Sequence, residues 1–468
     1  MGFYDIFNNS PSPIDNLKEI RTINEHLVSL TEQNNNITPE DFKRHDIKHG
    51  LRNSNGTGVL VGITGISDVH GYRLEKGEKV PDDGRLFYRG IDLYDIVREN
   101  RSKTRRLFEE TAFLLLFGQL PTAEELQDFN QILDTYRQLP NGFTENMILK
   151  IPSHDIMNKL QRSILVLYSH DEHPDDLSLN NLILQCIKLI ARVPTIVSYG
   201  LQAKSHYFDN KSLFIHSPQE GIGTAENILH MIRSDNHYTQ TEAETLDLAL
   251  VLHADHGGGN NSAFAVHVVS SSGTDTYSAI TAAIGSLKGP KHGGANNRVR
   301  DMMRDLTMNV ADIADERAIR NYLQQVINGS IYDRTGLIYG LGHAVYTKSD
   351  PRAVILKEKA RELASEKGKL EIFNLYEHVE TLGIELLKEK KGAHLDICAN
   401  VDLYSGLVYQ LLDIPEELYT PLFAVARIAG WCAHRIEQVM YESKIIRPAY
   451  VCPRQRQVYQ SIENRHTP

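Results

Sequence analysis

From about residue 105 onward, apolar residues recur at the spacing of an α-helix, and continuous β-strand alternation is nearly absent. One stretch shows the pattern in full: Thr122 and Glu125 form a capping-box pair, apolar residues follow at helical spacing, and Pro140 ends the run. Similar segments occur near 158–169, 180–193, 242–256, 260–271, 277–288, 295–307, 315–328, 354–366, 371–390, 404–412 and 420–442. No fixed repeat period is apparent, which disfavours a solenoid. The sequence therefore predicts a mostly α-helical protein.

The first hundred residues have a different character. Residues 1 to about 50 are polar, with one expected helix over 14–32, which is typical of an appendage or an oligomer arm. Residues 51–92 carry many glycines and short apolar alternations. This pattern predicts a few short strands or turns.

The composition of the 468 residues narrows the class of protein. With 41% hydrophobic and 24% charged residues, wholesale disorder is not expected, and a net charge of -10 argues against nucleic-acid or anionic-membrane partners. Cysteines 186, 398, 432 and 452 are far apart, which fits a reducing compartment better than a disulfide framework. The N-terminus lacks a basic start followed by an apolar run, so no secretory signal is expected. We expect a soluble, cytoplasmic protein.

The stretch GLGHAVYTKSDPR, residues 340–352, sets His343 behind two glycines and ends in Asp350-Pro351-Arg352. An imidazole exchanges protons near neutral pH, and a guanidinium can hold a carboxylate by two parallel hydrogen bonds. These residues favour a site for a small organic acid. A helix-connecting loop with a solvated His and Arg is an equally acceptable interpretation.

The segment HADHGGGN follows an apolar helical run, and its residues His253 and His256 are three positions apart, which predicts one helical face before the glycines stop the helix. A zinc site would need a third ligand and a nearby Glu, and the H-E-x-x-H order is absent. Helix-end histidines that interact with the helix dipole are favoured over zinc. A substrate contact from one histidine remains an alternative.

The segment GPKHGGAN places His292 in a turn before a helix expected to start near Ala295. The positive potential of a helix N-terminus lowers the pKa of such a histidine and favours the neutral imidazole. A neutral imidazole can donate a hydrogen bond to an oxygen that becomes anionic, as in enolisation. The alternative is a turn histidine without a role.

Two further charged residues lie in apolar surroundings. Asp402, in NVDLYSG at an expected helix N-terminus, is either an N-cap or a base that takes a carbon-bound proton. Arg427 lies inside an apolar helical run, where an internal acid or a bound carboxylate must balance its charge. For Arg447, before Pro448, a solvated loop arginine is favoured.

In order and spacing, HADHGGGN, GPKHGGAN, GLGHAVYTKSDPR and NVDLYSG closely resemble the citrate synthase family, and upstream GTGVLVGITGISDVHGY and FYRGIDL look like bacterial members. The resemblance covers about residues 45–455. It implies an all-α fold in which a small domain closes over a cleft in a large domain, and a homodimer or higher homo-oligomer. The expected parts are an extension over 1–45, a large domain over 46–297 and 409–468, and a small domain over 298–408.

The resemblance also implies roles for particular residues. His292 would stabilise the enol of acetyl-CoA, Asp402 would remove the methyl proton, and His343 would polarise the oxaloacetate carbonyl. The residues expected to bind oxaloacetate are His256, Arg352, Arg427 and, lent by the partner subunit, Arg447. Contacts with CoA are expected from the backbone of Leu337 to Gly340 and from Lys348.

The activity implied by the resemblance is condensation of acetyl-CoA, oxaloacetate and water to citrate and CoA, with acetyl-CoA as a substrate, no permanently bound cofactor and no metal. A 2-methylcitrate synthase using propionyl-CoA is the nearest alternative, because one methylene changes selectivity by only about 1–3 kcal/mol. A metal-dependent hydrolase built on His253 and His256, and a non-catalytic homologue that binds CoA esters or a protein partner, are the others. The sequence departs from many members at Gly257, where they carry Glu, and at Thr347, where they carry an arginine for a CoA phosphate.

Overall fold

The structure is a computed structural model that describes residues 16–35, 37–53, 55–76, 78–98, 106–392, 396–441 and 444–465, with side chains from residue 24 onward. The chain divides into two compact units, Met1–Val61 with Pro448–Pro468, and Gly62–Arg447. The described part of the first unit holds helices α1 (Asn16–Asn34) and α2 (Pro39–Arg44) and two short 3-10 helices, His49–Leu51 and Ile462–Asn464. The expected helix over 14–32 is α1, and positions 14 and 15 lie outside the described residues.

The second unit begins with a small antiparallel sheet. Its strands are β1 (Ser67–Glu75), β2 (Glu78–Tyr88) and β3 (Ile91–Asp92), in the order β1-β2-β3. Pairing runs from Ser67 opposite Tyr88 to Glu75 opposite Glu78, with a register shift between His70 and Tyr72. The strands expected within 51–92 are confirmed, and β1 and β2 are longer than the short strands that were expected.

Helices make up most of the second unit, which confirms the all-α class. They are α3 (Leu93–Arg98), α4 (Leu107–Phe117), α5 (Ala123–Tyr136), α6 (Ile156–Leu167), α7 (Leu179–Asp209), α8 (Thr224–Ile232), α9 (Gln240–His253), α10 (Asn261–Ser270), α11 (Thr276–Lys288), α12 (Ala295–Asn309), α13 (Glu316–Ile327), α14 (Pro351–Glu366), α15 (Leu370–Lys391), α16 (Val401–Leu411) and α17 (Tyr419–Tyr441). Short helices at Thr144–Leu149, Tyr168–His170 and Glu416–Leu418 complete the set.

Helix α7 differs from the expectation that it would end at 193. It continues through Pro194 to Asp209, and most of its central residues are buried. A proline inside a helix costs about 3 kcal/mol relative to alanine. Burial of an apolar side chain contributes about 1.5–3 kcal/mol, so packing against α5, α6, α8 and α17 outweighs that cost.

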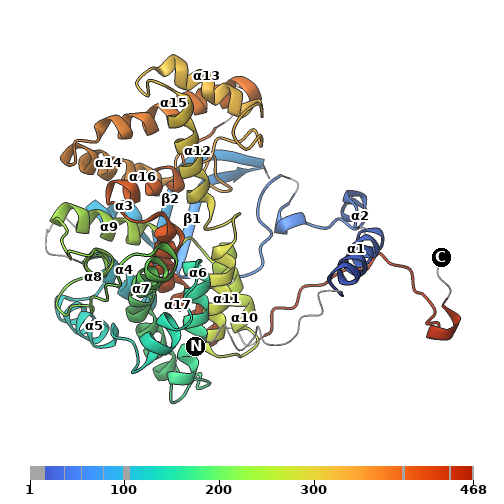
Figure 1. The fold of residues 1–468 in the computed structure, drawn as a ribbon, viewed down its shortest axis with the longest axis horizontal. Helices are drawn as coiled ribbons and strands as arrows, with labels where there is room; N and C mark the ends of the chain where they lie inside the picture. Colours follow the sequence, from blue (N-terminus) through green and yellow to red (C-terminus); the bar gives the residue numbers. More distant parts are fainter. Residues whose placement is uncertain are drawn as a thin grey trace. The chain divides into compact units, whose positions relative to one another are not determined.

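The core of the unit is organised around α17, which packs against α4, α7, α9, α10 and α11. Trp431, Arg427, His434 and Arg435 on this helix are all fully buried. Helices α12 to α16 contact one another and form the yellow-to-orange group in Figure 1. The division into large and small domains at 297 and 408 stays a prediction.

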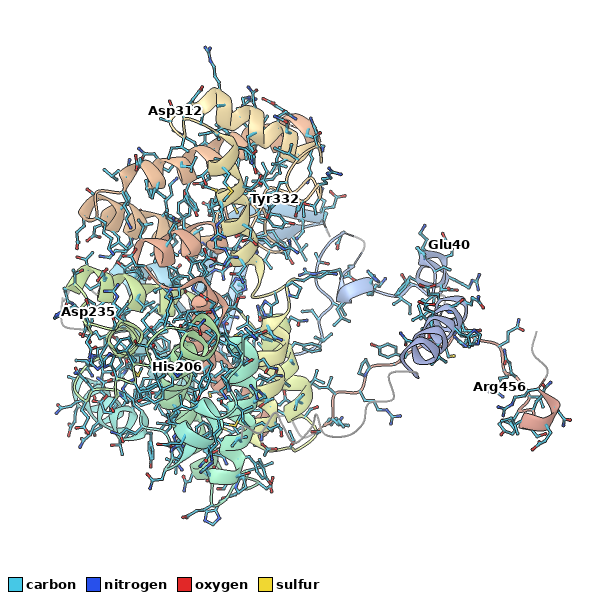
Figure 2. All side chains as sticks on the ribbon, in the orientation of Figure 1. Glu40, His206, Asp235, Asp312, Tyr332 and Arg456 are labelled. Carbon is cyan, nitrogen blue, oxygen red and sulfur yellow. The ribbon has the colours of Figure 1, made fainter. Side chains whose placement is uncertain are left out.

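The surface and the interior separate as expected for a folded helical unit. Labelled polar residues such as His206, Asp235 and Asp312 are exposed, while side chains fill the spaces between the helices (Figure 2). Among the described helices, α7 is long and apolar enough to cross a membrane, but 78% of its most apolar window is buried inside the protein. Its apolar residues therefore serve the core of this unit.

Candidate active site

The segment after α9 is held by a buried acid, Asp255. Its carboxylate accepts hydrogen bonds from Ser67 Oγ, from Gly257 N at 3.0 Å and from His434 Nε2, which lies 3.2 Å from each oxygen. Burial alone would raise the pKa of Asp255, but His434, Arg427 and Ser67 together hold it below its usual range. The carboxylate is therefore ionised at neutral pH and fixes the backbone next to His256.

The expectation that His253 and His256 share one helical face is wrong. Helix α9 ends at His253, and His256 lies beyond it in the turn. The turn requires Gly257, whose φ is +81° and whose added Cβ would lie 3.3 Å from Val69 Cγ2. A glutamate on this backbone would be strained, because side chains disfavour a positive φ and its Cβ would crowd Val69.

The loop carrying His343 is anchored to the start of α16. Asn400 N donates to Gly340 O at 2.9 Å, Gly342 N donates to Cys398 O at 2.8 Å, and Asn400 Nδ2 donates to Gly342 O at 2.9 Å. Gly340 has φ +88° and lies against Leu403, where a Cβ would be crowded. This short pairing brings the histidine loop and the helix of Asp402 together.

Asp350, which directly precedes α14, makes a second connection between the end of the His343 loop and the start of α16. Its carboxylate caps α14 by accepting from Arg352 N at 3.0 Å, and it accepts from Val401 N at 3.1 Å at the start of α16. It also receives Arg352 Nε at 3.0 Å and Nη2 at 2.8 Å in a bidentate pair. The guanidinium expected to hold a substrate carboxylate is thus already oriented by a carboxylate of the chain itself.

Three rings meet between these loops. The ring of His256 lies 5.3 Å from that of His343 and 5.5 Å from that of Tyr346, and the last two are 4.7 Å apart. His343 Nδ1 accepts hydrogen bonds from Val345 N at 3.0 Å and Tyr346 N at 3.1 Å. In the neutral ring these bonds place the proton on Nε2.

Buried positive charge gathers around His256. Burial and then Arg352, His343 and Arg427 hold the pKa of His256 well below its usual value, so its imidazole is neutral. Arg427 Nε donates to His253 O at 2.6 Å, while Nη1 and Nη2 of Arg427 and Nε2 of His256 make no hydrogen bond within the described part of the chain. Burial lowers the pKa of Arg427 to about 10, so the guanidinium remains charged. A buried cation with unpaired donors calls for an anion.

His292 lies in the expected turn, between the end of α11 at Lys288 and the start of α12 at Ala295. Burial, and next Arg427, lowers its pKa to about 4, so its ring is neutral as expected. Its Nε2 lies 3.1 Å from Ser262 Oγ. Phe423 lies near both His292 and Arg427: the centre of its ring is 6.2 Å from that of the His292 ring and 4.7 Å from the Arg427 guanidinium.

Asp402 lies in the first turn of α16 but does not cap it. The cap is Asn400, whose Oδ1 accepts from Asp402 N at 3.0 Å, so the N-cap interpretation of Asp402 is wrong. Burial raises the pKa of Asp402 to about 6, against the lowering effect of Arg352. Such a carboxylate is ionised near neutral pH and is more basic than an exposed aspartate.

Three expected positions lie outside this cluster. Arg447, Leu337 and Lys348 are exposed, and no described contact joins them to the cluster. Gly340 contributes backbone next to His343. Thr347 points inward and donates to Gly71 O at 2.8 Å, so the exposed side chain at this point is that of Lys348.

Several positioning residues were missed by sequence reasoning: Asp255, Ser262, Tyr346, Asp350 and His434. Asp255 and Asp350 lie within motifs that sequence reasoning singled out, and an acid beside a candidate histidine or arginine is a usable signal. His434 lies 179 residues from Asp255 and Trp431 lies 169 residues from Ser262, so only the fold reveals these contacts.

Comparison with known proteins gives one consistent result. A family model described as "Citrate synthase, C-terminal domain" matches residues 54–449. The chain is 34% identical over 409 residues to a citrate synthase of Haloferax volcanii, covering 86% of this chain and 94% of that one. It is 32% identical over 397 residues to 2-methylcitrate synthase 1 of Corynebacterium glutamicum, covering 84% and 92%. A solved ternary complex of citrate synthase from Thermoplasma acidophilum with carboxymethyl coenzyme A and oxaloacetate superposes with a TM-score of 0.72, at 27% identity over 90% of this chain and 99% of that chain.

Proposed function

The chain belongs to the citrate synthase family of acyltransferases. On that basis we propose that it condenses acetyl-CoA with oxaloacetate and water to give citrate and CoA. The observation that carries the proposal is Arg427, fully buried within electrostatic reach of His256 and Arg352 with two unpaired nitrogens. A small dicarboxylate supplies both the negative charge and the acceptors that these groups require.

The electrophile is oxaloacetate, bound by donors that are already in place. Arg427 Nη1 and Nη2 take one carboxylate, and Arg352, held by Asp350, presents its remaining N–H groups. His343 donates its Nε2–H to the ketone oxygen, because its Nδ1 is occupied by two backbone donors. Holding the ketone in this way makes the carbon–carbon bond-forming step effectively intramolecular.

The nucleophile is the enol of acetyl-CoA. Asp402 removes a proton from the methyl carbon, and the neutral ring of His292 donates a hydrogen bond to the thioester oxygen. Ser262 Oγ accepts from Trp431 Nε1 at 3.1 Å, and its one proton has two acceptors within reach, Asn260 Oδ1 at 2.9 Å and His292 Nε2 at 3.1 Å. When that proton goes to His292 Nε2, the ring proton is on Nδ1, from which it can meet the oxygen that becomes anionic.

The remaining steps follow from these positions. The enol carbon attacks the ketone carbon, the ketone oxygen takes the proton held on His343 Nε2, and citryl-CoA forms. Water then cleaves the thioester to release citrate and CoA. Closure of the two domains over the cleft would exclude water until condensation is complete. Acetyl-CoA enters as a substrate rather than as a resident cofactor.

A 2-methylcitrate synthase is the second candidate, because relatives of both kinds match the chain to a similar degree, 34% and 32% identity. The test is thiol release with oxaloacetate and either acetyl-CoA or propionyl-CoA, compared by kcat/KM at equal enzyme concentration. We expect the acetyl thioester to be the better substrate. A higher kcat/KM with the propionyl thioester would replace the first proposal by the second, and turnover of neither would reject both.

The CoA end and the assembly complete the proposal. Lys348, exposed beside the inward-pointing Thr347, and the backbone from Leu337 to Gly340 are proposed to meet the CoA moiety. Arg447, exposed in the single chain, is proposed to reach the oxaloacetate site of a partner subunit in a cytoplasmic homodimer or higher homo-oligomer.

A further inference from the structure

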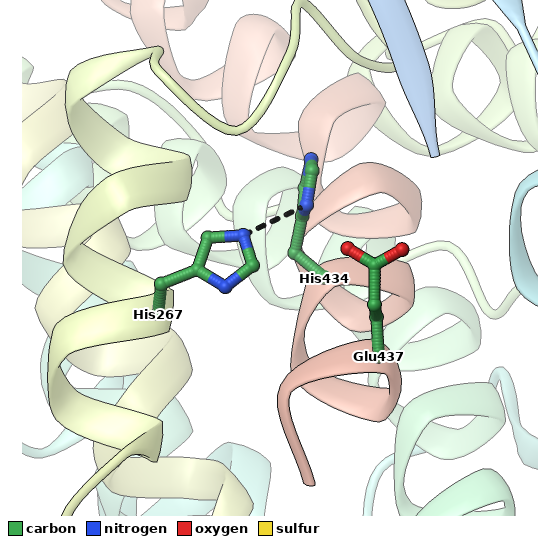
Figure 3. Close-up of side chains that lie close together, drawn as sticks. All are labelled: His267, His434 and Glu437. Carbon is green, nitrogen blue, oxygen red and sulfur yellow. Dashed lines mark hydrogen bonds between the residues drawn. The ribbon is translucent and has the colours of Figure 1, made fainter. Parts of the chain in front are cut away.

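A second group of potential ligands lies between α10 and α17, and it is not among the residues of the proposed reaction. His267 comes from α10, and His434 and Glu437 come from α17 (Figure 3). One donor atom from each side chain lies within 4.8 Å of the others. His267 Nε2 and His434 Nδ1 face each other at 3.1 Å.

The outer nitrogens of the two rings have partners that set their protonation. His434 Nε2 lies 3.2 Å from both carboxylate oxygens of Asp255, which are hydrogen-bond acceptors, so this nitrogen carries a proton. His267 Nδ1 lies 2.7 Å from the side-chain amide of Gln438, and with the amide oxygen facing the ring this nitrogen carries a proton too. In two neutral rings, the facing nitrogens are therefore both lone pairs.

Two such lone pairs at 3.1 Å repel each other unless a proton or a metal ion lies between them. The partners of the outer nitrogens are the carboxylate and carbonyl acceptors that commonly orient metal-binding histidines. Glu437 adds a third donor: its Oε2 accepts from Gly65 N at 2.8 Å, while its buried Oε1 makes no hydrogen bond within the described residues. Arg89 lies within electrostatic reach of Glu437, but the buried oxygen without a hydrogen-bond partner leaves a ligand position open.

The spacing fits a small tetrahedral ion. Two nitrogens bound to one zinc at about 2.0–2.1 Å in tetrahedral geometry lie about 3.3 Å apart, close to the separation found here. Glu437 then needs only a side-chain rotation, because its Oε1 has no other partner to leave. Two histidines and one carboxylate are borderline ligands that suit zinc, with water in the fourth position.

We propose that His267, His434 and Glu437 form a binding site for one zinc ion per chain, with a structural role. The ion would tie α10 to α17 and, through His434 and Asp255, fix the turn that carries His256. Through Glu437 and Gly65 it would also fix the entry to β1. This site is distinct from the metal-dependent hydrolase considered above, and it does not depend on which reaction the protein catalyses.

The test uses the full-length chain, stripped with a chelator and titrated with zinc. The exposed Cys452 is replaced by serine in every protein so that its thiol contributes no ligand. We expect one bound zinc per chain after gel filtration, a higher Tm with zinc, and the visible absorption of four-coordinate cobalt when Co²⁺ replaces zinc. His267→Gln and Glu437→Gln should each weaken zinc binding at least about tenfold and abolish the zinc-dependent rise in Tm.

Matched variants separate this site from other histidines. His343→Gln removes the histidine next to His256 in the proposed oxaloacetate site, and His230→Gln removes a buried histidine elsewhere. Both variants should keep the full equivalent of zinc. The proposal is wrong if the parent protein binds no zinc, or if both Gln variants at the site bind zinc as the parent does. Loss of zinc in His343→Gln alone would also overturn the proposal, because the ion would then lie in the proposed oxaloacetate site. If His267→Gln fails to fold, Glu437→Gln decides the question.

Discussion

At the scale of single residues, the two buried arginines of α17 have different surroundings. Arg435, like Arg427, has two buried nitrogens without a hydrogen bond among the described residues, but it donates to Thr274 O at 2.5 Å, and its neighbours Cys186, Asp275 and Cys432 all favour its positive charge. Asp255 and Tyr88 favour the positive charge of Arg427, whereas the nearby cation of Arg352 disfavours it. Both arginines are fully buried, so they form a matched pair for experiment.

Arg427→Met should lower kcat/KM for oxaloacetate by at least about 30-fold, because removing one partner of a buried charged contact costs about 2–5 kcal/mol. Thermal stability should change little, since the substitution also removes an unpaired buried charge. The measurement is steady-state kinetics with varied oxaloacetate, together with thermal unfolding.

Arg435→Met is the control for this prediction. It removes an equally buried arginine from the same helix but should leave KM for oxaloacetate within about twofold of the parent value. An equal rise of KM in both variants would assign the effect to disruption of α17 rather than to lost substrate contacts.

The carboxyl group of Asp402 predicts a pH profile. Its pKa is raised to about 6, and it must be ionised to act as a base, so kcat/KM should rise with pH through about 6 and then level off. His292, whose pKa is lowered to about 4, stays neutral across this range and adds no second limb. A rate profile that is flat between about pH 5 and 7 would contradict the assignment.

The same pKa predicts a stability difference for Asp402→Asn. A raised carboxyl pKa means that the folded state holds the proton more tightly, so stability falls as pH rises from about 4 to about 6 and stays lowered above that. The Asp402→Asn variant has no proton to release at this position, so it does not lose this stability as the pH rises. Its Tm should exceed the parent Tm by a few degrees at pH 7 and match it below about pH 4, while activity is lost. Equal Tm values at both pH values would mean that the carboxyl group is not destabilised by burial.

At the scale of elements, the β1–β2 hairpin supports the loop of His343 by direct backbone contact. Gly84 N donates to Ser349 Oγ at 3.0 Å, and Thr347 Oγ1 donates to Gly71 O at 2.8 Å. A Cβ at Gly84 would overlap the carbonyl oxygen of Ser349, and a Cβ at Gly71 would lie 2.7 Å from Val345 O. The glycines are thus required by the close approach of two backbones.

Gly84→Ala should therefore displace the loop that presents His343 and Arg352. We expect a lower Tm and a KM for oxaloacetate raised about tenfold or more, because small misplacements of positioning groups have large effects on rate. Gly62→Ala is the control, since an added Cβ there meets no atom within 4 Å. A KM unchanged in Gly84→Ala, with folding intact, would show that the hairpin does not position the loop.

At the scale of the whole molecule, the proposed site collects residues from segments far apart in the chain: the turn after α9, the loop before α14, the start of α16 and the middle of α17. Arg447, like Leu337 and Lys348, is a proposed site residue that no described contact brings to this cluster. A homodimer in which each subunit lends this arginine would complete both sites.

Mixing two inactive variants tests that arrangement. Co-expressed Asp402→Asn and Arg447→Met chains should recover up to roughly a quarter of parental activity, because half of random dimers are mixed and each mixed dimer has one intact site. Each variant alone should remain nearly inactive. Absence of recovery, with mixed dimers shown by differential tags, would place Arg447 in its own chain's site or outside any site.

The sequence by itself determined the helical class and the motifs of the site. Helical spacing is a local property, so α5, α11 and α12 begin and end within a few residues of expectation. Glycine and histidine motifs likewise place candidate groups on turns, as found for His292. The identity of these groups already indicates proton transfer and carboxylate binding.

Only the tertiary structure decided how those groups behave. Whether Asp402 caps its helix depended on competition from Asn400, and the path of α7 through Pro194 depended on burial against other helices. The low pKa of His256 and the raised pKa of Asp402 both arise first from burial, which the sequence does not state. Desolvation and long-range pairing depend on atoms more than a hundred residues apart, as between Asp255 and His434. The local pattern determined which residues could react, and the fold decided their charge and their partners.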